Sequence, residues 1–274
     1  MSSQMPQQGG DLPVHARERL SIMRGDATHQ GLFTSDLSVN EFLLVREAGF
    51  DPVGLVVGSS IYHIGFQFSG WRQNMEVNVL TQAMYHARGL AMTRMEEEAN
   101  ALGADGIVGV RLEITRYEWG ESMAEFVAIG TAIRSRSGQP FRNAAGRPFT
   151  SDLSGQDFWT LLRAGYRPVG MVMGNCVYHV AHMSLGQVLR QVGQNVEFAN
   201  YTQAVYDARE LAMERMQAEA SRLGAQGIVG AQIIERSHGW GSHVIEFFAV
   251  GTAIVPITAE HQIPAPALTL SLNT

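Results

Sequence analysis

The chain has few of the features that mark specialised classes of protein. It has one cysteine, Cys176, among 274 residues, so no intrachain disulfide can form and a reducing, cytoplasmic location is expected. No apolar run approaches the roughly 20 residues that span a bilayer, and the polar N-terminus lacks the apolar stretch of a signal peptide. The formal net charge is -6 and there is no basic block, which argues against a nucleic-acid partner.

Motifs of common catalytic and metal sites are absent as well. The chain has no CxxC or HExxH spacing, no Gly-x-Ser-x-Gly elbow, no phosphate loop and no dinucleotide fingerprint. Apolar residues make up 45% of the chain and charged residues 17%, which suits a globular protein with a sizeable core. The sequence therefore favours a non-enzymatic protein over an enzyme.

What the chain does have is an internal repeat. The segment Phe33–Ser38 returns as Phe149–Ser154, and Thr81–Ile133 matches Thr202–Ile254 without a gap, with roughly half of the positions identical. The second copy has a few extra residues around Ser184–Gln194. The predicted organisation is an N-terminal tail (1–30), copy 1 (31–134), a flexible linker (135–148), copy 2 (149–255) and a C-terminal tail (256–274).

Each copy is predicted to be a small α+β domain in the order α-β-α-β-β. Ser38 and Glu41 have the spacing of a capping box, which starts a short helix. Three strands and one long helix make a thin domain, so sheet edges and one sheet face need a further partner surface. In copy 1 the later elements are predicted as a strand at Pro52–Gly65, a helix at Glu76–Leu102 and two strands at Gly106–Tyr117 and Ser122–Ile133.

A mixed polar and aromatic stripe runs along the long helix beside its core-facing stripe. Its members step by four, three and four residues, and copy 2 repeats them letter for letter. Tyr, Met and Arg are enriched at protein interfaces, so the stripe predicts a domain–domain or subunit contact rather than a partly exposed helix flank. The eight residues are Thr81, Tyr85, Arg88 and Met92 in copy 1 and Thr202, Tyr206, Arg209 and Met213 in copy 2.

A Tyr-His pair in the first strand is also repeated, as Tyr62-His63 and Tyr178-His179. Neighbours on a strand point to opposite faces, so one residue of each pair is expected to reach a polar pocket or an interface. A pocket inside an assembly could take a small ligand there. The alternative is a histidine that is hydrogen-bonded for structural reasons.

The metal-ligand candidates lie in copy 2, where Cys176, His179 and His182 occur close together. Copy 1 has Ser60 in place of Cys176, so a metal site would belong to copy 2 alone. No cofactor is expected, and a transition metal is kept as an alternative.

Catalysis would have to use Glu125 or Glu246, which occupy equivalent positions in the last strand of each copy. Together with the two Tyr-His pairs, these two carboxylates are also the candidate ligand-binding residues. A carboxyl group in an apolar strand can have a raised pKa and act as a general acid. The favoured alternative is an ion pair with Arg88 or Arg209, across the domain or across an interface.

Several glycine-rich segments carry a family resemblance. Leu102–Gly109 followed by Gly130–Ile133, and Leu223–Gly230 followed by Gly251–Ile254, resemble the YbjQ-like putative heavy-metal-binding domain, here in two tandem copies. The resemblance implies a small fold that assembles into rings, with pentamers expected. It carries no firm ligand motif across, and the duplication departs from a simple single-domain ring.

These observations favour a non-enzymatic, self-assembling binding or structural module that forms a ring-like homo-oligomer and takes an unidentified small ligand. One alternative is a heavy-metal-binding or metal-sensing protein. The other is a hydrolase-like enzyme that uses Glu125 or Glu246.

Overall fold

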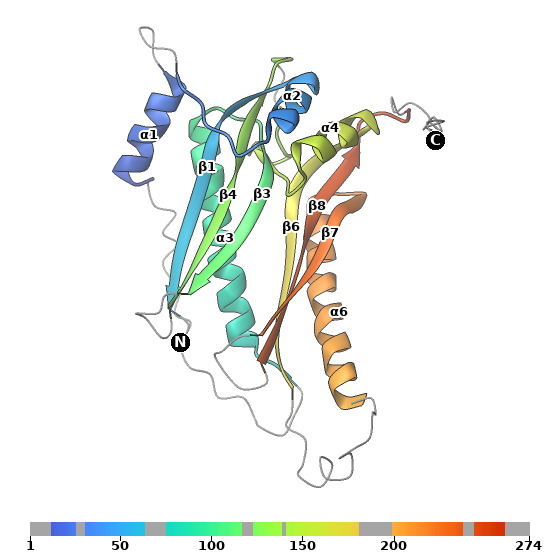
Figure 1. Ribbon diagram of the computed structural model, residues 1–274. Coiled ribbons are helices and arrows are strands. Elements are labelled where there is room, and N and C mark those ends of the chain that lie inside the picture. Colours follow the sequence, from blue (N-terminus) through green and yellow to red (C-terminus); the bar gives the residue numbers. More distant parts are fainter. Residues whose placement is uncertain are drawn as a thin grey trace, which may run out of the picture.

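The computed structural model describes residues 12–25, 31–63, 75–116, 123–138, 141–180, 199–237 and 244–260. Both copies fold as the sequence predicts, with a short helix, a strand, a long helix and two further strands (Figure 1). Helix α1 (Val14–Arg24) lies in the segment expected to be an N-terminal tail. Copy 1 consists of α2 (Val39–Glu47), β1 (Phe50–His63), β2 (Met75–Glu76), α3 (Asn78–Ala101), β3 (Gly106–Arg116) and β4 (Met123–Ser135). Copy 2 consists of β5 (Phe149–Thr150), α4 (Gly155–Arg163), β6 (Tyr166–His179), α6 (Ala199–Arg222), β7 (Gly227–Ser237) and β8 (Val244–Pro256).

Each sheet has three long antiparallel strands and one short strand that the other copy supplies. Sheet 1 has the order β1-β4-β3-β5, and sheet 2 has the order β2-β6-β8-β7. The short strand β5 belongs to copy 2 and pairs in parallel with β3, whereas β2 belongs to copy 1 and pairs antiparallel with β6. The predicted three-stranded sheet is therefore confirmed, and the two copies exchange a fourth strand that was not predicted.

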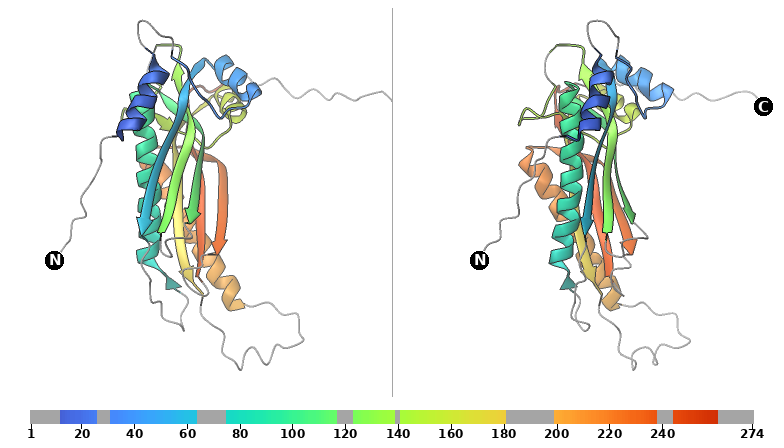
Figure 2. Two further views of the ribbon diagram at one scale, coloured as in Figure 1. Left: turned by 60° about the vertical axis from the view of Figure 1, so that its left-hand side comes forward. Right: turned by 90° about the vertical axis from the view of Figure 1, so that its left-hand side faces the viewer.

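The short helices begin where the sequence predicts. The Ser38 side chain accepts a hydrogen bond from the Glu41 amide, and the Glu41 carboxylate accepts one from the Ser38 amide, which completes a capping box. In copy 2 the Ser154 side chain accepts from the Asp157 amide in the same way. The two short helices, α2 and α4, pack on each other at one end of the molecule (Figures 1 and 2).

The long helices pack unusually close to the first strand of their own sheet. A β-carbon added at Gly58 would lie 2.0 Å from the backbone oxygen of Ala91, and one added at Gly174 would lie 1.8 Å from that of Ala212. Only glycine permits this approach. Met84, Ala87 and other members of the predicted core stripe are fully buried on this side of α3.

One edge of sheet 1 is capped by a helix carboxylate. Glu98 of α3 accepts a hydrogen bond from the Val57 amide at 2.9 Å, and Arg19 of α1 donates to the same carboxylate. In copy 2 Glu219 accepts from the Met173 amide at 2.7 Å, and burial raises the pKa of Glu219. Helix α1 lies beside α3 and β1, as Figure 2 shows, so it covers the edge strand.

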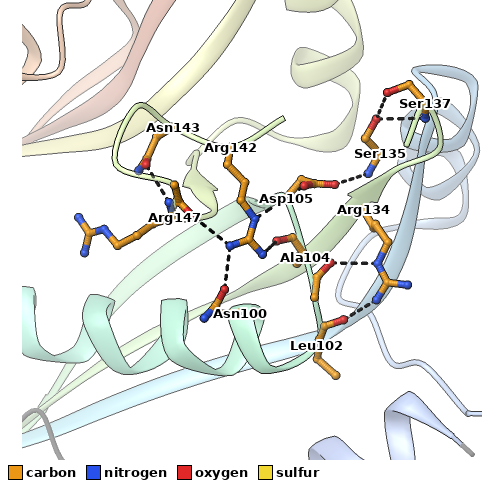
Figure 3. A network of polar contacts seen from close by, with 12 residues as sticks. Asn100, Leu102, Ala104, Asp105, Arg134, Ser135, Ser137, Arg142, Asn143 and Arg147 are labelled. Atoms are coloured by element: carbon orange, nitrogen blue, oxygen red, sulfur yellow. Dashed lines mark hydrogen bonds and ion pairs between the residues drawn. The ribbon is translucent and has the colours of Figure 1, made fainter. Parts of the chain in front are cut away.

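The connection between the copies is held by hydrogen bonds over its described part, although a flexible linker was expected. Arg142 donates to the Asn100 side chain at 2.8 Å and to the Ala104 carbonyl at 2.8 Å, both near the end of α3 (Figure 3). Its guanidinium also lies 3.8 Å from Asp105. These contacts hold the described part of the connection against the C-terminal end of α3, where helix carbonyl groups lack partners within the helix.

Within the described residues, no helix is both long and apolar enough to span a bilayer.

The close helix–strand approach gives a stability prediction. Gly58→Ala forces α3 away from β1, so its free energy of unfolding should fall by about 1–3 kcal/mol. The matched control is Gly89→Ala in the same helix, where an added β-carbon meets nothing within 4 Å, and this change should stabilise by about 0.5–1 kcal/mol. Urea denaturation measures both values, and equal effects of the two variants would contradict the close-packing account.

Candidate assembly interface

The two sheets differ in how many of their faces are covered. Along β1, buried residues alternate with half-buried or exposed ones, which is the pattern of a strand with one covered face. Along β6, every residue from Pro168 to His179 is buried. Helix α6 covers one face of sheet 2, and α3 of copy 1 packs against the other face.

Arg88 of α3 is buried at this contact. Its side chain is 2% exposed, and its Nη2 atom lies 2.6 Å from Oε1 of Glu246 in β8, which is fully buried. The guanidinium carbon lies 4.1 Å from the Phe248 ring centre of sheet 2 and 5.7 Å from the Phe126 ring centre of sheet 1. Burial lowers the pKa of Arg88, and the Glu246 carboxylate opposes this shift. The ion pair confirms one of the two pairings expected from the sequence.

Thr81 and its neighbours fix the register of α3 on β6. The Val177 amide donates to the Thr81 hydroxyl at 2.9 Å, and the Asn175 side-chain amide donates to the Thr81 carbonyl at 3.2 Å. Arg215 of α6 forms a two-pronged ion pair with Glu76 at 2.6 and 2.9 Å, and it also donates to the Asn175 carbonyl at 2.6 Å. The hydrogen bond with Glu76 raises the pKa of Arg215.

The ion pair between Glu76 and Arg215 was not predicted from the sequence. The one feature of the sequence that points to Arg215 is that it repeats Arg94 at the equivalent position of the other long helix.

An arm of copy 2 completes the contact at the edge of sheet 1. Phe149 pairs with Gly106 and Thr150 with Ile107, and a β-carbon added at Gly106 would lie 2.1 Å from the Phe149 ring. Gly106 therefore leaves room for this ring. At the same end of the molecule, the Gly155 amide of copy 2 donates a hydrogen bond to the Glu41 carboxylate of copy 1 at 3.2 Å. The pKa of Glu41 is lowered, and its hydrogen bond with Ser38 is the largest cause.

These contacts form the internal interface, which has two unlike sides. Copy 1 contributes the helix side, made of the outer stripe of α3 and the edge of β3 that pairs with β5. Copy 2 contributes the sheet side, made of the face of β6 and β8 and the arm Phe149–Thr150. Three predicted interface residues of copy 1 are buried in it, namely Thr81, Arg88 and Met92, while Tyr85 is half-buried.

The helix side of copy 2 is more exposed than that of copy 1. Tyr206 is 56% exposed, and the Arg209 side chain is 40% exposed and lies 3.4 Å from Glu235 of the same copy. Thr202 and Met213 are half-buried. Along the β7 edge, Ile228 and Val229 are half-buried, whereas their counterparts in β3 are fully buried under the arm.

The sheet side of copy 1 is likewise uncovered by the residues that the structure describes. Ile61 is 58% exposed, and Glu125, Val127 and Ile129 are half-buried. Their counterparts Val177, Glu246, Phe248 and Val250 are all buried beneath α3.

Within the described part of one chain, the two Tyr-His pairs predicted as ligand residues do not share a pocket. Tyr178 packs in the core under α6, whereas His179 follows it on the opposite face of β6, as strand geometry requires. Tyr62 packs edge-on against His86 of α3, and His63 is exposed.

A cavity of about 620 Å³ lies elsewhere, beside the N-terminal half of α3. Thr81, Tyr85, Asn175 and Arg215 are among the residues that line it, and none of the six predicted ligand residues is. It is therefore a part of the internal interface.

The metal candidates are separated too. Cys176 packs in the core under α6, and His179 lies on the other face of β6, while His182 lies outside the described residues. Burial raises the pKa of the Cys176 thiol to about 12, which disfavours the thiolate form that binds metals. Within the part of the chain that the structure describes, no three His, Cys, Asp or Glu side chains cluster as a metal site would require.

Comparison with known proteins supports the two-copy organisation. The family described as "Putative heavy-metal-binding" (YbjQ) matches residues 67–136 and 165–256. The "Encapsulin nanocompartment protein Rv1762c" of Mycobacterium tuberculosis is 52% identical over 248 residues, which cover 90% of this chain and 92% of that protein.

Two shorter relatives match about a third of the chain. A UPF0145 protein of Halorubrum lacusprofundi is 37% identical over 106 residues, 37% of this chain and 99% of that protein. A UPF0145 protein of Clostridium perfringens is 39% identical over 85 residues, 29% of this chain and 78% of that protein. The short relatives therefore have the length of a single copy.

The buried ion pair gives the prediction for this interface. Arg88→Met leaves the Glu246 carboxylate buried without its partner, so the free energy of unfolding should fall by about 3–5 kcal/mol. The double variant Arg88→Met/Glu246→Leu buries no charge and should recover most of that loss. Urea denaturation of both variants measures this, and a double variant no more stable than the single one would show that the buried charge is not the cause.

Proposed function

Because this chain belongs to the YbjQ family and carries two of its domains in tandem, we propose that it is a non-enzymatic structural module that assembles with copies of itself into a closed, ring-like homo-oligomer.

The observation that carries the proposal is the unequal covering of two equivalent sheet faces. In copy 2 the face is buried under α3, while in copy 1 the same face presents apolar side chains such as Ile61, Val127 and Ile129. Ile61 is exposed and Val127 and Ile129 are half-buried, and apolar side chains left accessible side by side in this way mark an interaction site. Within the described part of the chain, this face is therefore covered in copy 2 and left accessible in copy 1.

The relative from M. tuberculosis supports the same conclusion. It is named as a nanocompartment protein, and it aligns with this chain across both copies rather than one. An assembled compartment requires subunits that associate, which agrees with a module that has complementary surfaces left uncovered.

The catalytic alternative has less support. Glu246 is fully buried and in contact with Arg88, so it is engaged in holding the two copies together. Its counterpart Glu125 lies on the face proposed here for assembly. We further propose a cytoplasmic location, which fits the single, buried cysteine.

Light scattering coupled to size-exclusion chromatography tests the proposal. We expect one discrete species at micromolar concentration, with a mass that is a whole multiple of the 30.0 kDa chain. Elemental analysis of the same peak separates this from the metal-binding alternative, which requires stoichiometric zinc or copper. A monomer at this concentration would overturn the proposal.

A further inference from the structure

We propose that the uncovered sheet side of copy 1 is occupied by α6 of a second copy of the same chain, in the geometry that α3 uses inside the chain. This inference rests on the proposed self-assembly and names the partner and the surfaces.

The helix side of copy 2 carries the same residues as the helix side that is already docked. Thr202, Tyr206, Arg209 and Met213 repeat Thr81, Tyr85, Arg88 and Met92. Each arginine is also placed alike over its own sheet: the guanidinium carbon of Arg209 lies 5.4 Å from the Phe247 ring centre, against 5.7 Å from Arg88 to the equivalent Phe126. Arg209 is thus placed to extend beyond its own copy as Arg88 does.

The sheet side of copy 1 offers the matching carboxylate at the matching position. Ile61 pairs with Glu125 across β1 and β4, as Val177 pairs with Glu246 across β6 and β8. When α6 of one chain lies on sheet 1 of the next as α3 lies on sheet 2, Arg209 meets Glu125. The pair then has the charge complementarity of the buried pair within the chain.

The backbone of this face is also arranged alike in both copies. Arg94 donates to the Ser59 carbonyl at 2.5 Å, as Arg215 donates to the Asn175 carbonyl at 2.6 Å.

Two differences between the copies weaken the copy 1 face, because Val127 stands at the position of Phe248 and Ser59 at the position of Asn175. The contact between chains therefore lacks one ring under the arginine and one side-chain amide, so it should be weaker than the contact within the chain.

The strand edge supplies a second, independent match. The arm Phe149–Thr150 of copy 2 has its counterpart in Phe33–Thr34 of copy 1, and Phe33 is 42% exposed where Phe149 is fully buried. At Gly106 a β-carbon would collide with the Phe149 ring, but at Gly227 it would meet only Ile254, at 3.7 Å. Near Gly227, none of the described residues therefore takes the place that the Phe149 ring has beside Gly106, and Phe33 of a second chain would fill it.

The two sides are different surfaces, so the contact is head-to-tail. Among the residues that the structure describes, each chain leaves one helix side uncovered in copy 2 and one sheet side uncovered in copy 1. Repeating such a contact gives a ring when the rotation closes and a filament when it does not. A closed ring with every contact made contains an even number of domains, because each chain contributes two. Five domains cannot form it from whole chains, whereas five chains would place ten domains in the ring.

The test uses one variant for each side of the contact. Met213→Arg places a cation on the helix side, at the counterpart of the buried Met92. Ile129→Arg places one on the sheet side, at the counterpart of the buried Val250. Both residues are half-buried in a single chain, so the variants should fold, which circular dichroism and thermal denaturation check. Glu210→Arg on the exposed side of α6 is the control and should assemble like the wild type.

The expected result is that each variant alone is a monomer, because burying an uncompensated charge should weaken association at least about 100-fold. Mixed together, they should give a complex of two chains and nothing larger. The intact sheet side of Met213→Arg binds the intact helix side of Ile129→Arg, and the remaining surfaces are both blocked.

Three other outcomes are distinguishable. If the wild type is itself a monomer, the proposed function fails together with this inference. If the wild type assembles and both variants assemble as it does, these surfaces are not the contact and the inference alone is overturned. If the variants are folded monomers that do not combine, the head-to-tail arrangement is wrong, and a symmetric contact or another partner covers sheet 1.

Discussion

A sheet has two faces, and each copy of this domain has one long helix with which to cover them. Copy 2 solves the problem by using α6 on one face and α3 of copy 1 on the other. Copy 1 has no such donor within its own chain among the residues that the structure describes, so the face around Ile61 and Val127 is uncovered. Duplication therefore satisfies one sheet and leaves one sheet face and one helix flank for other chains, which is the origin of the proposed assembly.

The polar contacts decide how the helix lies on that face. Contacts between an apolar helix flank and an apolar sheet allow several registers of the helix. A buried arginine allows only the register in which it forms an ion pair with a carboxylate, because an unpaired buried charge is strongly destabilising. Arg88 meets Glu246, and Thr81 accepts from the Val177 amide, so a shift by one helical turn would lose both contacts. In the proposed contact between chains, Arg209 and Glu125 provide the same selection. Within a single chain the Arg209 side chain is 40% exposed and pairs with Glu235 of its own copy.

The sequence predicted those parts of the fold that repeat or have a local signal. The capping box at Ser38, the core stripe of α3 and the Thr-Tyr-Arg-Met stripe could all be read from spacing, because helical periods are visible in a single sequence. The exchange of β2 and β5 could not be predicted, because a strand of two residues shows no hydrophobic periodicity. The role of Gly106 was also missed, because its cause is the Phe149 ring of the other copy. For Cys176 and His179, closeness in sequence suggested a shared site that the two faces of a strand keep apart.

Disulfide cross-linking between two singly substituted chains tests the head-to-tail contact most directly. Phe33→Cys and Gly227→Cys sit at the positions that correspond to the paired Phe149 and Gly106, where neighbouring strands lie within reach of a disulfide. The native Cys176 is buried and its pKa is raised to about 12, so it should not compete. Oxidation of the mixed, assembled proteins should give a covalent dimer that neither protein forms alone. An assembled mixture that forms no such dimer would contradict the account.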